Sequence, residues 1–223
     1  MSCIIDVHTH HISLAENNGK AIVCLSVSEE SFRSSLSVCL KNHIPVSVGL
    51  HPWGVEADWQ SFMNDELRAL LSSRQVLAVG EAGLDKIRGG LWEWQLAAFR
   101  AQIELAEEVG KPLLIHCVKA IDEIIHLRRG YSPNVPWIIH GFRGKKEQAI
   151  QLIEKGFYLS FGEYYHEEAL QVCPTDRLLM ETDESPIDIH ALYVRAAQIK
   201  EMDVEAFRNQ IKRTVGELFP SFL

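Results

Sequence analysis

Eight short apolar runs recur along the 223-residue chain, and an amphipathic stretch follows most of them. The runs are rich in valine, isoleucine and leucine, which is typical of strands buried on both faces of a parallel sheet. Strands that alternate with helices predict parallel β/α units, and eight such units predict a (β/α)8 barrel. The runs span Ile4–Val7, Ala21–Val27, Pro45–Leu50, Val76–Val79, Pro112–Ile115, Trp137–Ile139, Phe157–Phe161 and Leu178–Met180.

The stretches between these runs carry their apolar residues on one side and therefore predict helices. They span Ser31–Leu40, Trp59–Leu71, Leu91–Val109, Ala120–Arg128, Lys145–Glu154, Glu167–Val172, Ala191–Lys200 and Val204–Phe219. Only residues 11–20 separate the first two runs, and a parallel crossover usually takes a dozen residues or more. We therefore expect a distorted barrel whose first outer helix is short or missing. A doubly wound open sheet is the alternative.

The composition, 47% hydrophobic and 23% charged, is typical of an ordinary globular domain. No Ser/Pro-rich linker, charge block or internal repeat divides the sequence, so we expect a single domain over residues 1–223. Neither a signal peptide nor an apolar run of the ~18 residues that span a membrane is found, which predicts a cytoplasmic protein with no membrane partner. Five cysteines without a CxxC pair predict reduced, buried thiols.

Histidine, aspartate or glutamate follows six of the eight runs. These side chains are His8 and His10, His51, Glu81, His116, His140 and Asp183. The three residue types make up 40 of 223 residues, so chance would place one at roughly one position in six. In a barrel the carboxyl ends of the strands meet at one face, and active sites lie on that face. The pattern therefore predicts a functional site at this face.

Two histidines spaced by two residues, His8 and His10, point to the same side of an extended chain and can reach one ion. Four imidazoles and two carboxylates exceed what one tetrahedral ion needs, and they suit two divalent ions about 3.5–4 Å apart with a bridging carboxylate. Imidazole ligands favour Zn, Mn, Fe or Ni over Mg, although the sequence does not select one. Taken alone, each of His116 and His140 would be interpreted as a core histidine bonded to a carbonyl group.

Motifs spread from residue 6 to residue 186 resemble, in their order, those of one known family. Asp6–His10 resembles DxHxH, Gly49–Pro52 resembles GxHP, Gly80–Asp85 resembles GExGLD, His140–Gly144 resembles HCFSG, and Glu181–Pro186 resembles ETDxP. This ordered set resembles the TatD-type metal-dependent deoxyribonucleases, a branch of the amidohydrolase-like metal-dependent hydrolases.

The resemblance implies a distorted (β/α)8 barrel that binds two divalent ions and hydrolyses phosphodiester bonds, with the 3' or 5' ends of DNA among its substrates. It implies that His8, His10 and Asp183 bind one ion, that His116 and His140 bind the second, and that Glu81 lies between the ions. It also places His51 near the substrate phosphate.

Two positions depart from the family pattern. Val118 stands where the HxRxA motif has its arginine, and the loop after Asp183 runs almost directly into the next helix. Both departures remove groups that would hold a phosphate or a nucleic-acid strand. Arg143 or Lys119 is a candidate replacement.

The sequence supports a hydrolytic mechanism in which Asp183 and Glu81 are the catalytic carboxylates. Asp183 would accept the proton of the attacking water, and Arg143 would hold the anionic group of the substrate with its bidentate guanidinium. Asp6 and Asp85 would orient the ligating histidines, or would instead cap turns and strand ends.

Two other functions remain open. The wider amidohydrolase group contains C–N hydrolases of small molecules, many with a modified lysine on the fourth strand, and Glu81 at that place favours phosphoester chemistry instead. A barrel that keeps its metals and acts as an interaction module is the second alternative. The net charge of −8 argues against a broad basic nucleic-acid surface. The sequence indicates no protein partner and no oligomeric state.

Overall fold

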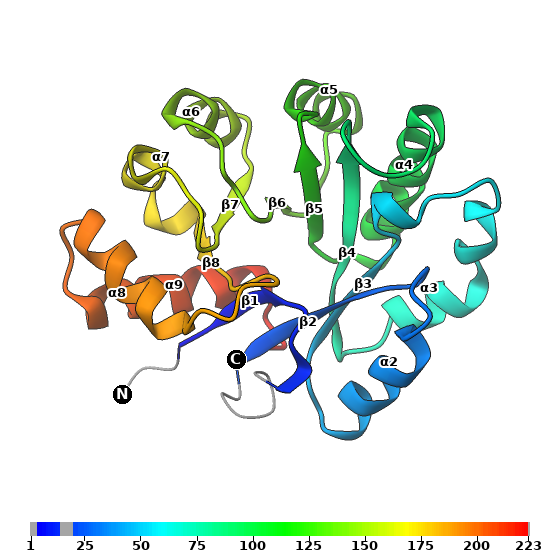
Figure 1. Ribbon diagram of the computed structural model, residues 1–223, viewed down its shortest axis with the longest axis horizontal. Coiled ribbons are helices and arrows are strands. Elements are labelled where there is room, and N and C mark those ends of the chain that lie inside the picture. Colours follow the sequence, from blue (N-terminus) through cyan, green and yellow to red (C-terminus); the bar gives the residue numbers. More distant parts are fainter. Residues whose placement is uncertain (1–3, 14–19, 223) are drawn as a thin grey trace. The chain divides into compact units, whose positions relative to one another are not determined.

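A computed structural model describes residues 4–13 and 20–222 of the chain. It contains eight parallel strands whose order in the sheet is their order in the sequence (Figure 1). This sequential order differs from that of a doubly wound sheet, in which the strand order reverses. The strands are β1 (Asp6–Thr9), β2 (Ala21–Ser26), β3 (Val46–Gly49), β4 (Val76–Asp85), β5 (Leu113–Val118), β6 (Trp137–Ile139), β7 (Tyr158–Phe161) and β8 (Leu178–Met180).

Eight α-helices are found in the described part of the chain. They are α2 (Phe32–Lys41), α3 (Asp65–Leu71), α4 (Trp92–Val109), α5 (Ile121–Tyr131), α6 (Lys146–Glu154), α7 (Glu167–Val172), α8 (Ile189–Ile199) and α9 (Val204–Leu218). Short 3-10 turns lie at η1 (Pro52–Gly54), η2 (Trp59–Phe62) and η3 (Thr175–Arg177). The expected shortening of the first outer helix concerns residues 11–20, most of which lie outside the described residues.

Two predicted elements differ from those observed. The predicted helix Trp59–Leu71 is broken into η2 and α3 because the side chain of Asn64 accepts a hydrogen bond from the backbone N–H of Leu67 and begins a new helix. Strand β4 extends to Asp85 instead of ending at Val79, so Glu81 lies inside the strand rather than after it.

The glycines of β4 allow this extension. A Cβ atom at Gly83 would lie 2.0 Å from the carbonyl oxygen of His116 on β5, and Gly83 has a φ of +152°. Only glycine tolerates both the close approach and this backbone conformation. Strands β4 and β5 stay in register from Ala82, which lies opposite Ile115, to Asp85, which lies opposite Val118.

The contacts within the chain divide it into two compact units. The first comprises the described residues up to Val23 together with 138–222, and it contains β1, β7, β8 and helices α6–α9. The Tyr193 hydroxyl of α8 donates to the carbonyl oxygen of Ile5 at 2.8 Å and ties this helix to the start of β1. Phe157, Phe161 and Phe207 are completely buried in this unit.

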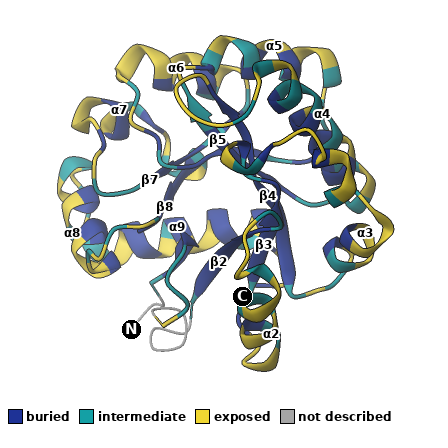
Figure 2. Cartoon of the chain, turned by 45° about the vertical axis from the view of Figure 1, so that its right-hand side comes forward, coloured by how far each residue is buried: buried dark blue, intermediate teal, exposed yellow. Residues whose placement is uncertain are grey.

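The second unit comprises residues 24–137 and contains β3, β4, β5 and helices α2–α5. Two buried glutamines of α4 hold its strand ends. The Gln102 side chain bonds both the N–H (2.7 Å) and the C=O (3.0 Å) of Leu50, just after β3, and Gln95 does the same for Asp85 (2.9 and 3.1 Å) at the end of β4. Within each unit the strands are buried and the helices expose one side (Figure 2).

No helix among the described residues is long and apolar enough to span a membrane. The described cysteines, Cys24, Cys39, Cys117 and Cys173, are free thiols, and all but Cys117 are buried. The extent of the single domain predicted over residues 1–223 stays a prediction.

Candidate metal centre

The first unit brings His8, His140 and Asp183 together, each from the end of a different strand. One ligand atom from each of the three lies within 4.8 Å of the others. The imidazole rings of His8 and His140 are 4.4 Å apart, and Asp183 Oδ1 lies 3.4 Å from His8 Nε2 and 3.6 Å from His10 Nε2. His8, His10, His140 and Asp183 therefore lie in one region of this unit, although the family resemblance implied that His140 shares an ion with His116. Their role as metal ligands stays a prediction.

The backbone explains how Asp183 reaches the histidines. Its N–H donates to the carbonyl oxygen of His8 at 2.9 Å, and its own carbonyl accepts from the N–H of His10 at 3.2 Å. Asp183 has a φ of +58°, a left-handed conformation that aspartate tolerates better than most side chains. The chain thus leaves β8 in a tight turn, with the carboxylate of Asp183 beside the end of β1.

Two buried carboxylates, Asp6 and Glu181, form hydrogen bonds with residues of this cluster or next to it. Asp6 accepts hydrogen bonds from the N–H of His8 (3.2 Å) and from the N–H (3.1 Å) and hydroxyl (2.6 Å) of Thr182. It thus binds the backbone of β1 and the segment after β8. Among the described residues, it forms no hydrogen bond with an imidazole. Burial raises the pKa of Asp6 to about 7, although these hydrogen bonds oppose the rise. Glu181 Oε1 accepts from the N–H of Gly141 at 2.6 Å and lies 3.4 Å from His140 Nδ1.

The second unit brings together His51, Glu81 and His116. Glu81 is 3% exposed, and its Oε1 lies 2.7 Å from His116 Nδ1 and 3.0 Å from His51 Nε2. His51 Nδ1 accepts the backbone N–H of Trp53 at 3.1 Å. A neutral His51 therefore carries its proton on Nε2 and donates it to Glu81, which favours a hydrogen-bonding role over a ligand role for His51.

Asp85 fixes the other side of His116. Its Oδ2 lies 3.2 Å from His116 Nε2 and accepts from the Trp53 indole N–H at 2.7 Å, and its Oδ1 accepts from the N–H groups of Ile87 and Arg88. Burial tends to raise the pKa of Asp85, but these hydrogen bonds outweigh it and the net pKa is lowered. The ionised Asp85 holds a proton on His116 Nε2 and also caps the turn after β4, so its contacts agree with both roles that the sequence left open for it. Its role in orienting a metal ligand stays a prediction.

This tautomer tests whether a cation suits the cluster. With the proton on Nε2, His116 Nδ1 presents a lone pair to Glu81 Oε1 at 2.7 Å. Two acceptors at this distance need a proton or a cation between them. Imidazole and carboxylate donors are also the ligands of Zn, Mn and related divalent ions. The residues therefore fit a divalent metal.

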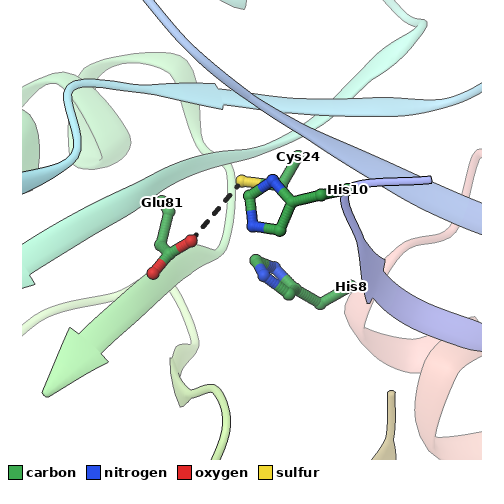
Figure 3. A group of neighbouring side chains, drawn as sticks. All are labelled: His8, His10, Cys24 and Glu81. Atoms are coloured by element: carbon green, nitrogen blue, oxygen red, sulfur yellow. Dashed lines mark hydrogen bonds between the residues drawn. The ribbon is translucent and has the colours of Figure 1, made fainter. Parts of the chain in front are cut away.

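Sequence reasoning missed the contacts of Cys24 and Glu181. The Cys24 thiol lies 4.0 Å from Glu81 Oε2 and donates to it (Figure 3). Burial, reinforced by the charge of Glu81, raises the pKa of Cys24 well above its ordinary value, so it stays a thiol. For Glu181, the cost of burying a carboxylate two residues before Asp183 was a usable signal.

Arg143, the predicted substrate-binding residue, is exposed and lines a cavity of about 260 Å³ in the first unit together with Glu181, Asp183 and Tyr164. Its guanidinium lies 5.3 Å from the centre of the Tyr164 ring. Arg143 thus shares a cavity with Asp183, the carboxylate predicted to be catalytic, and its role in substrate binding stays a prediction.

Known proteins share both the sequence and the fold of this chain. The model of the family described as "TatD related DNase" matches residues 5–220. A protein named 3'-5' ssDNA/RNA exonuclease TatD, from Edwardsiella piscicida, is 31% identical over 176 residues, which cover 74% of this chain and 67% of the relative. An uncharacterized metal-dependent hydrolase of Buchnera aphidicola is 29% identical over 227 residues, covering 90% and 84% of the two chains.

Solved structures agree on the fold. A TatD homologue from Escherichia coli K12 has a TM-score of 0.84 with 22% identity over 99% of both chains. A TatD family hydrolase from Entamoeba histolytica has a TM-score of 0.78 with 18% identity over 98% of both chains. These similarities confirm the predicted α/β barrel fold of eight parallel strands.

The family match, the named relatives and the donor clusters together define a metal-dependent hydrolase, and the fold is of the barrel type. The chain belongs to the TatD-related DNase family. This membership confirms the family predicted from the ordered motifs, and with it phosphodiester hydrolysis as the class of reaction.

Proposed function

We propose that this protein is an exonuclease that removes nucleotides from the ends of single-stranded DNA or RNA, using two divalent ions. The ligands would be His8, His10, Glu81, His116, His140 and Asp183. The observation that carries the proposal is the pair of carboxylate–imidazole clusters, one in each unit, in a chain matched by the family model over residues 5–220. The substrate is taken from the names of two exonuclease relatives.

Divalent ions at such a centre lower the pKa of water enough to supply a nucleophile near neutral pH. Asp183 is the proposed general base, because its side chain is 25% exposed and is held beside His8 and His10. Asp85 keeps His116 in the tautomer whose Nδ1 is available as a ligand. His51 donates its Nε2 proton to Glu81 in this structure, and we propose that it donates this proton to an oxygen of the substrate phosphate when Glu81 binds the ions.

The test is the substitution Asp183→Asn, measured with single-stranded oligonucleotides and added Mn or Zn. We expect kcat to fall about 10²–10⁴-fold, which is the usual contribution of a general base. Asp188→Asn is the matched control: Asp188 caps α8 by accepting the N–H of His190, and asparagine caps equally well. Unchanged hydrolysis in Asp183→Asn would contradict the assigned base.

A panel of substrates separates this function from the two alternatives. Oligonucleotides, simple phosphodiesters and cyclic amides are each incubated with the metal-loaded protein. Turnover of the oligonucleotides supports the proposal. Turnover of the amides alone would identify a C–N hydrolase, and binding of two metal equivalents without any hydrolysis would favour an interaction module.

A further inference from the structure

An exposed tryptophan lies beside the His51–Glu81–His116 cluster. Trp53 belongs to η1, directly after β3, and is 41% exposed. Its ring packs edge-on against the imidazoles of His51 and His116, with centroid distances of 4.7 and 5.7 Å. A large aromatic surface therefore faces solvent immediately next to side chains of the proposed centre.

The indole is held in place. Its N–H donates to Asp85 at 2.7 Å, and Asp85 is itself held by three further hydrogen-bonding groups. A rigid aromatic side chain loses little conformational entropy when it binds a ligand, so the exposed face is ready for contact.

A guanidinium group completes the surface. Arg88 lies over the Trp53 ring, 3.9 Å from its centroid, and the N–H groups of Ile87 and Arg88 donate to Asp85 at 2.8 and 2.9 Å. Within residues 4–13 and 20–222, Arg88 has no ion pair with a carboxylate, whereas nearby Lys86 pairs with Glu123. The same carboxylate, Asp85, thus positions both the aromatic ring and the loop that carries the cation.

Unpaired nucleobases stack on indole rings and on guanidinium planes, and a guanidinium also pairs with phosphate. We propose that Trp53 and Arg88 form a stacking subsite for an unpaired base next to the scissile bond. This inference rests on the proposed function and narrows the substrate to ends whose terminal bases are unstacked. Trp53 and Arg88 are specificity residues and take no part in the chemical step.

The test uses an oligothymidylate of about ten nucleotides and its abasic counterpart of equal charge. Binding is measured by anisotropy in EDTA, and kcat/KM is measured with Mn. We expect Trp53→Ala to weaken binding of the oligothymidylate about 10-fold and to leave abasic binding unchanged, because stacking needs the base. Trp53→Phe should keep most of the preference for the oligothymidylate, since it keeps an aromatic face.

The control variant is Trp92→Ala, which removes another indole that lies under a cation, Lys86 at 5.4 Å. Trp92→Ala should leave the binding of both the oligothymidylate and the abasic oligomer unchanged. For Arg88→Gln we expect the slope of log K against log[salt] to become shallower by about the value of one phosphate contact. If Trp53→Ala weakens oligothymidylate and abasic binding equally, the subsite is refuted while the nuclease function stands. If the wild type binds both oligomers without hydrolysing either, the nuclease function fails, and the anisotropy comparison still decides the subsite.

Discussion

Asp85 accepts hydrogen bonds from four groups: the Trp53 indole, two backbone N–H groups and the imidazole of His116. Ionisation is what lets one carboxylate accept all of them, and the lowered pKa of Asp85 follows from the same bonds. Individual side chains of this kind decide which tautomer a candidate ligand adopts.

For Asp85→Asn we therefore expect metal affinity and kcat to fall about 10–100-fold, because the amide is neutral and directs N–H groups toward donors. Isothermal titration with Zn and steady-state kinetics measure the two effects. Asp188→Asn is again the control. Wild-type metal affinity in Asp85→Asn would contradict the role of this carboxylate.

A second prediction at the residue scale concerns Cys173. Burial raises the pKa of its thiol from 9.0 to about 12. Between these pH values the unfolded chain loses the proton and the folded protein keeps it, so the stability supplied by this thiol is present below pH 9 and is lost as the pH rises toward 12. Urea unfolding of the wild type and of Cys173→Ala, compared from pH 8 upward, should show a difference that declines above pH 9. A difference in the free energy of unfolding that stays constant with pH would contradict this prediction.

Among elements, the β4–β5 pair determines where Glu81 and His116 lie. The close approach of the two strands depends on Gly83, whose hydrogen faces the carbonyl oxygen of His116. The α4 glutamines then hold the carboxyl ends of β3 and β4 at fixed places against the helix.

Replacing Gly83 by alanine should lower the free energy of unfolding by about 1–3 kcal/mol, since the new Cβ atom would meet the His116 carbonyl in a backbone conformation that alanine avoids. Chemical denaturation measures the change. Gly130→Ala is the control, because nothing lies within 4 Å of its Cβ position in α5, and we expect a gain of about 0.5–1 kcal/mol there. Equal effects in the two variants would contradict the close-approach argument.

Sequence patterns predicted the order of the elements and most of their bounds, because buried parallel strands leave continuous apolar runs. The end of β4 was missed because glycines normally weaken strands, and their tolerance here depends on a neighbour that lies 33 residues away, His116 opposite Gly83. Ligand candidates were predictable from their places after the runs. The contacts of Cys24, Trp53 and Glu181 were not, because each depends on which side chain meets it across strands.

For the whole molecule, each compact unit contains proposed metal ligands of its own: His8, His10, His140 and Asp183 belong to one unit, and Glu81 and His116 belong to the other. Ions that bind only the folded protein stabilise it by mass action, by about 2.7 kcal/mol at a concentration 100 times Kd. Folding and metal binding are therefore expected to be linked.

We accordingly expect EDTA to lower Tm and Mn or Zn to restore it, with about two metal equivalents bound. Differential scanning calorimetry and elemental analysis measure these quantities. His140→Ala should lose part of the metal-dependent increase in Tm, and His126→Ala, on the exposed side of α5, should keep all of it. A Tm that is independent of metal would contradict the ligand set.

The hydrogen bond between Trp53 and Asp85 has a thermodynamic consequence, because Asp85 also holds His116. Coupling free energies are reciprocal, so an oligonucleotide that tightens the hold on His116 raises metal affinity by the same factor by which metal raises oligonucleotide affinity. A mutation of Trp53 that alters substrate specificity would then also change the affinity for the metal ions. Substrate specificity and metal affinity would therefore evolve together.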